Sequence, residues 1–116
     1  MLTRGLRAML LAACAMATGL AWSQSGKTLR FVVGYPPGGS GDFVTRTVGE
    51  AIAAELGVTP VIDNRPGAAG NLATEIVVKS TDGATLLVAS NPYINKALYK
   101  KLAYDVEKDL IPVTLL

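Results

Sequence analysis

The chain has 116 residues, of which 11 are Lys or Arg, 9 are Asp or Glu and none is His. The formal net charge of +2 equals the contribution of Arg4 and Arg7, so the rest of the chain is neutral. Neutrality with scattered basic residues excludes the electrostatic footprint of a nucleic-acid-binding protein, and the lack of His argues against a metal site of the common His/Cys type.

The first 23 residues have the layout of a secretory signal peptide. Arg4 and Arg7 precede a mostly apolar run over residues 8–21, and Ala21-Trp22-Ser23 supplies the small residues that a signal peptidase reads. We therefore expect residues 1–23 to be removed and the mature chain to begin at Gln24. The alternative is a lipoprotein, because Leu11-Ala12-Ala13-Cys14 resembles a lipobox; the apolar run before Cys14 is short and continues beyond it, which favours cleavage before Gln24. Cleavage there removes the only cysteine.

The mature region opens with a strand, a turn and a helix. Residues 28–34 are mostly apolar, as in a strand that is covered on both faces. The prolines and glycines of residues 36–41 predict a turn, and Ser40 or Asp42 is the expected N-cap of a helix that ends near Leu56, with Gly57 just beyond it. The face of this helix that we expect to be buried consists of Val44, Val48, Ala51, Ile52 and Leu56.

Shorter elements follow in alternation. We expect a strand over residues 59–63, a glycine-rich loop, a helix over 71–79, a strand over 85–89, a short helix over 93–101 and a turn near 104–109. In the helix over 71–79, the expected buried residues are Leu72, Ile76 and Val77. The apolar residues 111–116 predict a last strand. Because the chain stops inside this strand, we interpret residues 24–116 as the front part of a longer protein.

Alternating strands and helices predict an α/β fold with a parallel sheet in βαβαβ order. We expect right-handed crossovers and the strand order 2-1-3, with the first strand in the centre. The three loops rich in Gly, Pro and polar residues then lie at the carboxyl edge of the sheet, where open α/β sheets bind their ligands.

The loop between the first strand and the first helix is the strongest candidate site. Backbone N–H groups of Gly38, Gly39, Ser40 and Gly41 are expected to converge with the N-terminus of the helix, an arrangement that attracts anions, including carboxylates. A side chain at Gly39 should obstruct that approach. The alternative is a plain connection that packs the helix on the sheet. The loop lacks the residues of a Walker or dinucleotide-binding motif.

Five sequence blocks in order resemble the periplasmic solute receptors of tripartite tricarboxylate transporters, the Bug family. The resemblance covers nearly the whole mature region and is carried by Val33-Gly34-Tyr35-Pro36-Pro37-Gly38-Gly39-Ser40-Gly41-Asp42, Asp63-Asn64-Arg65-Pro66-Gly67-Ala68-Ala69-Gly70-Asn71, Asp82-Gly83-Ala84-Thr85-Leu86-Leu87, Asn95-Lys96-Ala97-Leu98-Tyr99-Lys100-Lys101-Leu102-Ala103-Tyr104-Asp105 and Lys108-Asp109-Leu110-Ile111-Pro112-Val113-Thr114. Thr or Ser is common in the family where Gly41 stands, and receptors of the family are much longer than this chain.

The resemblance implies the N-terminal part of one lobe of a type II periplasmic binding protein, with the second lobe absent. It implies a periplasmic receptor, not an enzyme, that captures a small carboxylate such as an organic acid or amino acid for the membrane components of the transporter, without a cofactor, metal or nucleic acid. The ligand-binding residues that we predict are Tyr35, Pro37, Gly38, Gly39, Ser40, Gly41, Asp42, Ser90 and Asn91.

Several readings of these residues stay open at this point. Tyr35 is either a platform for the ligand or a lid on the core, and Asp42 is a helix cap, a ligand contact or both. Arg65 is either a carboxylate clamp or a solvated loop residue. For the whole chain, the alternatives are the truncated nucleotide-binding half of a secreted α/β enzyme and a nonfunctional fragment.

Overall fold

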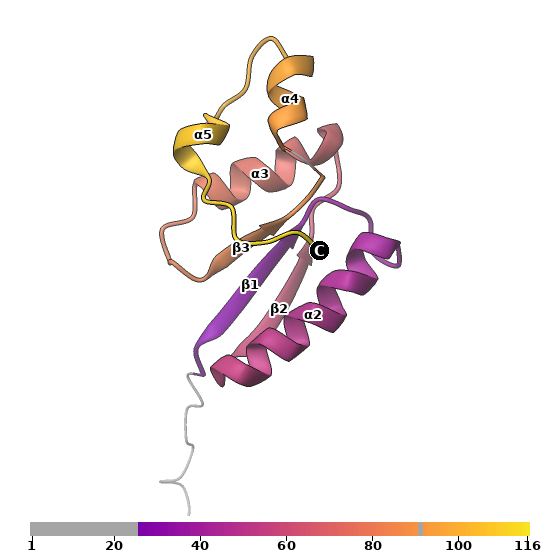
Figure 1. The fold of residues 1–116 in the computed structure, drawn as a ribbon, viewed down its shortest axis with the longest axis vertical. Coiled ribbons are helices and arrows are strands. Elements are labelled where there is room, and N and C mark those ends of the chain that lie inside the picture. The colour runs from indigo at the N-terminus through magenta and orange to yellow at the C-terminus, as the bar shows by residue number, and fades with distance from the viewer. Residues whose placement is uncertain (1–25, 91) are drawn as a thin grey trace, which may run out of the picture.

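A parallel sheet of three strands lies at the centre of the computed structural model, which describes residues 26–90 and 92–116 (Figure 1). The strands are β1 (Thr28–Val33), β2 (Thr59–Asn64) and β3 (Thr85–Val88). Their order is β2-β1-β3, and Thr28 lies opposite Thr59 while Arg30 lies opposite Thr85. The predicted α/β class, the parallel sheet and the strand order are confirmed. The predictions for residues 1–23 and for Asn91 fall outside the described residues.

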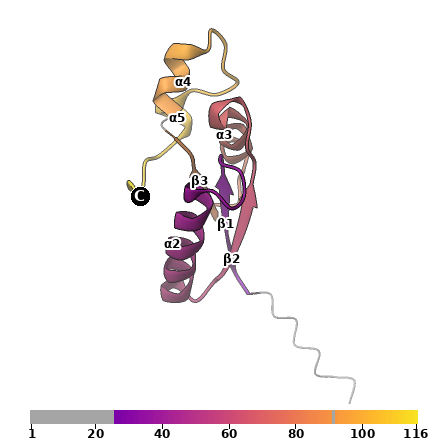
Figure 2. The same cartoon turned by 90° about the vertical axis from the view of Figure 1, so that its right-hand side faces the viewer.

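The two longest helices cover opposite faces of this sheet (Figure 2). Helix α2 (Ser40–Leu56) contacts β1 and β2, and α3 (Asn71–Val78) contacts β1 and β3. The alternation of side chains along β1 explains this, because Phe31 packs against Gly49 of α2 whereas Gly34 lies against Ala73 of α3. The first crossover leads to one side of β1 and the second to the other, so the fold is doubly wound and its switch point lies between β1 and β3.

The buried face of α2 is not the predicted one. Its buried residues are Asp42, Thr45, Gly49 and Ala53, while Leu56 is 62% exposed. A Cβ on Gly49 would stand 3.2 Å from the ring of Phe31. The helix therefore lies too close to the sheet for large residues in the central row, and Val44, Val48 and Ile52 are half-buried beside it. The predicted end of the helix is confirmed, because Gly57 adopts a left-handed conformation with φ of 64°.

The remaining helices are short: one lies between β2 and α3, and the other two follow β3 in the chain. They are the single-turn η2 (Ala68–Gly70), α4 (Pro92–Leu98) and α5 (Val106–Asp109). Helix α5 confirms the predicted helical turn. In α3 the buried residues are Asn71, Ala73 and Thr74; the predicted core residue Leu72 is 47% exposed, and Ile76 and Val77 are half-buried.

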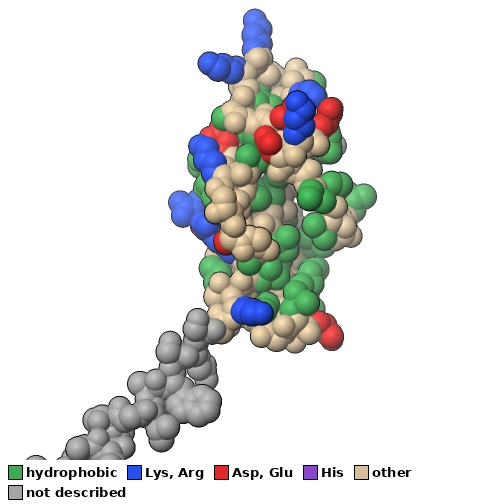
Figure 3. Space-filling view, turned by 90° about the vertical axis from the view of Figure 1, so that its left-hand side faces the viewer, with side chains coloured by type: hydrophobic (Ala, Val, Ile, Leu, Met, Phe, Trp, Pro, Cys, Tyr) green, Lys and Arg blue, Asp and Glu red, His purple; other side chains and the backbone are tan. Residues whose placement is uncertain are grey.

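The predicted strand over residues 111–116 is wrong. These residues form no regular secondary structure, and Ile111, Val113 and Leu115 are exposed. The ladders of the described sheet join only β1, β2 and β3, and the segment is paired with neither of the edge strands β2 and β3. Apolar side chains are accordingly visible on the molecular surface (Figure 3). Within residues 26–90 and 92–116, none of the helices has the length and apolar character needed to cross a membrane.

Candidate functional site

The loop between β1 and α2 turns sharply at Gly38. Gly38 has φ of +82°, which lies in the left-handed region that favours glycine. Gly39 is the N-cap of α2 with φ of −83°, and a Cβ there would meet only the Pro36 carbonyl oxygen at 3.5 Å. The protein itself therefore has room for a side chain at Gly39, and the residue that requires glycine for its backbone is Gly38. That a side chain at Gly39 would obstruct the approach of a ligand stays a prediction.

Asp42 holds this loop in place from the first turn of α2. Its buried carboxylate accepts hydrogen bonds from the Gly38 N–H at 3.0 Å, from Arg46 Nε at 3.0 Å and from Asn64 Nδ2 at 2.9 Å. These donors, Arg46 first, lower the pKa of Asp42 to about 2, so the group is ionised at neutral pH. Neither Ser40 nor Asp42 is the N-cap that we predicted, since that position belongs to Gly39.

The available backbone donors begin two residues later than predicted. The Gly38 N–H donates to Asp42, and the Gly39 N–H donates to the Pro36 carbonyl at 3.4 Å. The first intrahelical bond runs from the Phe43 N–H to the Gly39 carbonyl. Ser40, Gly41 and the N–H of Asp42 thus occupy the first-turn positions whose N–H groups have no acceptor within an α-helix. They are the groups of this loop best able to receive an anion.

Tyr35 covers the start of the helix and depends on Gly41 to do so. A Cβ on Gly41 would stand 2.7 Å from Cγ of the Tyr35 ring, closer than packed side chains approach. Thr or Ser at this position would displace the ring. With glycine at residue 41, the loop lacks the hydroxyl donor that Thr or Ser would supply. In its place, the half-buried ring of Tyr35 packs closely against the backbone.

Three of the predicted site residues share one cavity. This cavity of about 340 Å³ has walls formed by Tyr35, Ser40, Gly41, Val44, Leu87, Val88, Ala89, Thr114, Leu115 and Leu116. Pro37, Gly38, Gly39 and Ser90 are exposed outside this lining, and Asp42 lies behind it. The lining contains no charged side chain, so the first-turn N–H groups supply its main preference for an anion.

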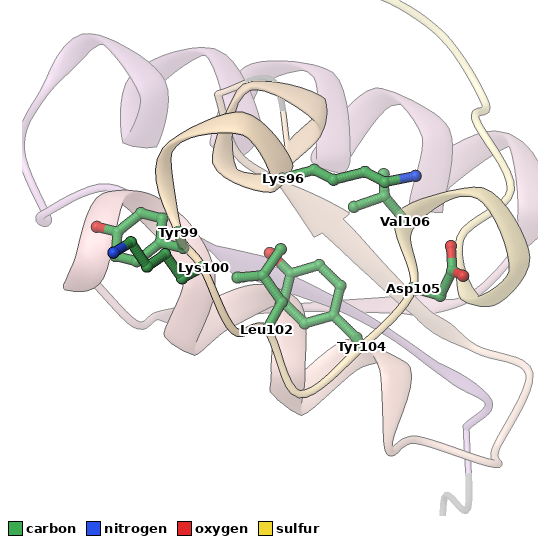
Figure 4. Close-up of a pocket in the computed structure, with 7 residues that line it drawn as sticks. All are labelled: Lys96, Tyr99, Lys100, Leu102, Tyr104, Asp105 and Val106. Carbon is green, nitrogen blue, oxygen red and sulfur yellow. The ribbon is translucent and has the colours of Figure 1, made fainter.

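A second cavity of about 220 Å³ lies between α4 and α5 (Figure 4). It is lined by Lys96, Tyr99, Lys100, Leu102, Tyr104, Asp105 and Val106. Its main polar groups are engaged within the protein, since Lys96 Nζ donates to Glu107 at 2.9 Å and the Tyr104 hydroxyl donates to Asn71 at 2.5 Å. None of the predicted site residues lines it.

The carboxyl ends of the strands converge beside the first cavity. A Cβ on Gly34, directly after β1, would stand 3.2 Å from Gly70 Cα and 3.2 Å from Ala89 Cβ. Asn64, at the end of β2, joins the loops, because its Nδ2 donates to the Tyr35 carbonyl at 3.2 Å as well as to Asp42. The predicted meeting of the loops at one edge is thus observed around Gly34.

Arg65 is engaged with its neighbour on β2. Its Nε donates to Asp63 Oδ1 at 2.7 Å, and Arg30 forms an ion pair with the same carboxylate. Both arginines lower the pKa of Asp63, with Arg30 the larger cause. Arg65 is thus held in an ion pair within the protein, on a carboxylate that it shares with Arg30.

A buried polar cluster behind the site was not predicted from the sequence. Asn71, Asn95 and Tyr104 are each less than 10% exposed and are joined by hydrogen bonds. They lie far apart in the chain, and only an asparagine at the start of a helix offers a local signal. Within the described part of the chain, no three His, Cys, Asp or Glu side chains come together as a metal site would require.

The sequence of this chain is similar to those of one family of known proteins. The sequence model described as "Tripartite tricarboxylate transporter family receptor" matches residues 44–116. A UPF0065 protein of Bordetella bronchiseptica is 38% identical over 97% of the chain, and the protein BugT of Bordetella pertussis is 34% identical over 77%. The chain spans only 36% and 28% of the lengths of these relatives.

Solved structures give the same result for the fold. The periplasmic binding protein BugD is 34% identical, with a TM-score of 0.50 over 53% of this chain and 21% of its own. A second structure, described as a periplasmic transporter, has the same identity and TM-score over 54% of this chain and 21% of its own.

Proposed function

This chain belongs to the receptor family of the tripartite tricarboxylate transporters, and we propose that it forms part of a periplasmic receptor that captures a small carboxylate. The ligand is an organic acid or an amino acid, and the receptor hands it to the membrane components of its transporter. The names of the relatives and of the similar structures support a binding protein, not an enzyme. The predicted cleavage before Gln24 and its lipoprotein alternative fall outside the described residues.

One observation carries the choice of an anionic ligand. The N-terminus of α2 opens into a cavity that has no charged side chain in its lining. The N–H groups of Ser40, Gly41 and Asp42 carry the positive end of the helix dipole there. The buried carboxylate of Asp42 is compensated by Arg46, which limits its repulsion of an incoming anion.

The site that we propose has distinct roles for the predicted residues. Ser40 and Gly41 donate to one carboxylate, and Tyr35 packs against the body of the ligand. Gly38 and Asp42 shape the loop, with Pro37 and Gly39 beside them. Ser90 and Asn91 face the ligand from the end of β3.

The test is titration calorimetry of the full chain, in the form that the cell exports, with citrate, L-glutamate and benzoate. ATP serves as the competing probe for a nucleotide-binding protein. Binding of at least one carboxylate but not of ATP is the expected result. Binding of ATP alone, or of none of these molecules by a folded protein, would contradict the proposal.

A matched pair of variants locates the site. Gly41→Ala pushes the Tyr35 ring off the helix N-terminus and should weaken carboxylate binding about tenfold, or about 1.4 kcal/mol. Gly26→Ala adds the same methyl group at the opposite edge of the sheet, where the nearest atom is Thr59 Oγ1 at 3.7 Å. It should leave the dissociation constant unchanged. Equal affinities of a folded Gly41→Ala variant and the original protein would remove the loop from the site.

A further inference from the structure

Three buried polar side chains from different segments form one hydrogen-bonded unit, which we name the amide lock: Asn71, Asn95 and Tyr104. Asn95 Nδ2 donates to Asn71 Oδ1 at 2.9 Å and to the Ala69 carbonyl at 3.0 Å. The Tyr104 hydroxyl donates to the same Asn71 oxygen at 2.5 Å. Burial of polar groups is costly unless they are paired, so these bonds fix the relative positions of α3, α4 and the segment before α5.

The amide lock holds a turn with an unfavourable backbone. Gly67, Ala68, Ala69 and Gly70 have φ values of 134°, 48°, 54° and 85°. Two of these residues are alanines, which pay a steric cost in the left-handed region. Such a conformation persists only where the surrounding structure enforces it. Asn95 binds the Ala69 carbonyl, and the buried Thr74 hydroxyl donates to the Gly70 carbonyl at 2.9 Å.

The strained turn touches the strand that carries the proposed site. Gly70 Cα would stand 3.2 Å from a Cβ on Gly34, the residue between β1 and Tyr35. A Cβ on Gly70 would in turn stand 3.4 Å from Ala89 Cβ, at the end of β3. Because this contact leaves no free space, a shift of the turn moves the ends of both strands.

We propose that Asn71, Asn95 and Tyr104 are positioning residues, which hold the strained turn and thereby preorganise the β1–α2 loop for its ligand. The first half of this proposal, that the lock controls both loops, follows from the contacts alone. The second half, that ligand affinity depends on it, rests on the proposed function. A rigid loop binds more tightly because less freedom is lost on binding.

Hydrogen exchange of the unliganded full chain tests the first half. Tyr104→Phe removes one hydroxyl without changing the shape of the ring. Loss of one hydrogen bond should speed amide exchange about two- to tenfold in residues 68–71 and also, across Gly34, at Gly38, Gly39 and Phe43, whose N–H groups are hydrogen-bonded in the β1–α2 loop. Tyr99→Phe is the matched control, since Tyr99 is 38% exposed and lies on the neighbouring surface, and it should change neither segment.

Faster exchange confined to residues 68–71 would overturn the proposal, since the lock would then be a local structural feature. Asn95→Leu, which removes the hydrogen bonds to the Ala69 carbonyl and to the Asn71 side chain, should reproduce the effect of Tyr104→Phe in both segments. Unchanged exchange in both variants would also overturn it.

Titration with citrate, L-glutamate and benzoate tests the second half. Tyr104→Phe should weaken binding of the accepted carboxylate about two- to tenfold at a temperature where the variant is fully folded. Unchanged affinity would overturn this half. If the original protein binds none of these probes, the proposed function fails, whereas the exchange measurement still decides whether the lock controls the loop.

Discussion

Two glycine-rich turns leave the carboxyl edge of the sheet, one after β1 and one after β2, and they are stabilised in different ways. In the β1 turn, the left-handed backbone falls on Gly38, which adopts it without a steric cost. In the β2 turn it also falls on Ala68 and Ala69, for which it is unfavourable. The β1 turn leads into the first residues of α2, which line the larger cavity, whereas the β2 turn is bound by the buried side chain of Asn95.

The partners of the two turns differ accordingly. A charged side chain of the following helix, Asp42, binds the backbone of the β1 turn four residues away. A neutral side chain distant in sequence, Asn95, binds the backbone of the β2 turn. The left-handed residue of the β1 turn thus has a local partner, with Asn64 of β2 supporting the loop from further away, whereas the left-handed Ala69 is bound by a side chain from another helix. Similar composition in two turns thus does not imply a similar role.

The largest expected effect comes from the residue where the two turns meet. Gly34→Val places a branched side chain 3.2 Å from Gly70 Cα and 3.2 Å from Ala89 Cβ, and neither backbone nor Cβ atoms can move aside easily. We expect a loss of about 3 kcal/mol or more in the free energy of unfolding, at the upper end of overpacking costs. Urea denaturation followed by circular dichroism measures it.

Gly26→Val is the control, since the space beside Gly26 is open to 3.7 Å and the residue lies at the other end of β1. It should change stability by less than about 0.5 kcal/mol, as surface substitutions do. Equal stabilities of the two variants would mean that the turns do not meet as closely as described.

The elements could be predicted from the sequence because periodicity, prolines and glycines act locally. The strand order 2-1-3 could be predicted because it is common in doubly wound α/β sheets. The buried face of α2 could not be predicted from the sequence. Apolar periodicity places Val and Leu on the buried face, whereas the close contact with Phe31 requires the small residue Gly49 there. The hydrogen bond between Asn95 and Ala69 joins residues 26 positions apart, and no local pattern announces it. The strand predicted over residues 111–116 failed for a related reason, since apolar character alone does not provide a pairing partner.

The second-largest expected effect is a loss of stability caused by a substitution in the β1–α2 loop. Asp42→Asn keeps the shape of the side chain but replaces one acceptor oxygen with a donor, which conflicts with the Gly38 N–H and Arg46. We expect a fall in stability at pH 7, smaller than that of Gly34→Val. The pKa of Asp42 is lowered to about 2 in the folded protein, against about 3.9 in an unfolded chain.

The sign of the pH dependence follows from this lowered pKa. As the pH falls, the unfolded state takes up a proton first, so the stabilisation is present above about pH 5 and is lost toward about pH 2. The difference in stability between the original protein and Asp42→Asn should shrink over that window. Asp63 and Asp82, whose pKa values are also lowered, are present in both proteins and largely cancel in the difference. A constant difference down to pH 2 would show that the charge of Asp42 does not hold the turn.

The smallest expected effect is a gain in stability in the β2 turn. Ala69→Gly removes the steric cost of the left-handed backbone, while the carbonyl that Asn95 binds is unchanged. The gain is reduced by the greater freedom of glycine in the unfolded chain, so we expect about 0.5–1 kcal/mol. The reverse change in the β1 turn, Gly38→Ala, should lower the free energy of unfolding by about 1 kcal/mol. The two substitutions should therefore change stability in opposite directions.

Ala54→Gly is the control that separates relief of the left-handed backbone from the general effect of an alanine-to-glycine substitution. Ala54 is exposed within α2, in a right-handed helix, where the same substitution should cost about 1 kcal/mol. A gain at residue 69 together with a loss at residue 54 can arise only from the backbone conformation of the turn. A loss at both positions, in matched thermal melts, would mean that the alanines of the β2 turn are not strained and that the amide lock has no strain to hold. Strain at Ala69 is therefore the measurable difference between a turn that glycine shapes by itself and one that the domain enforces.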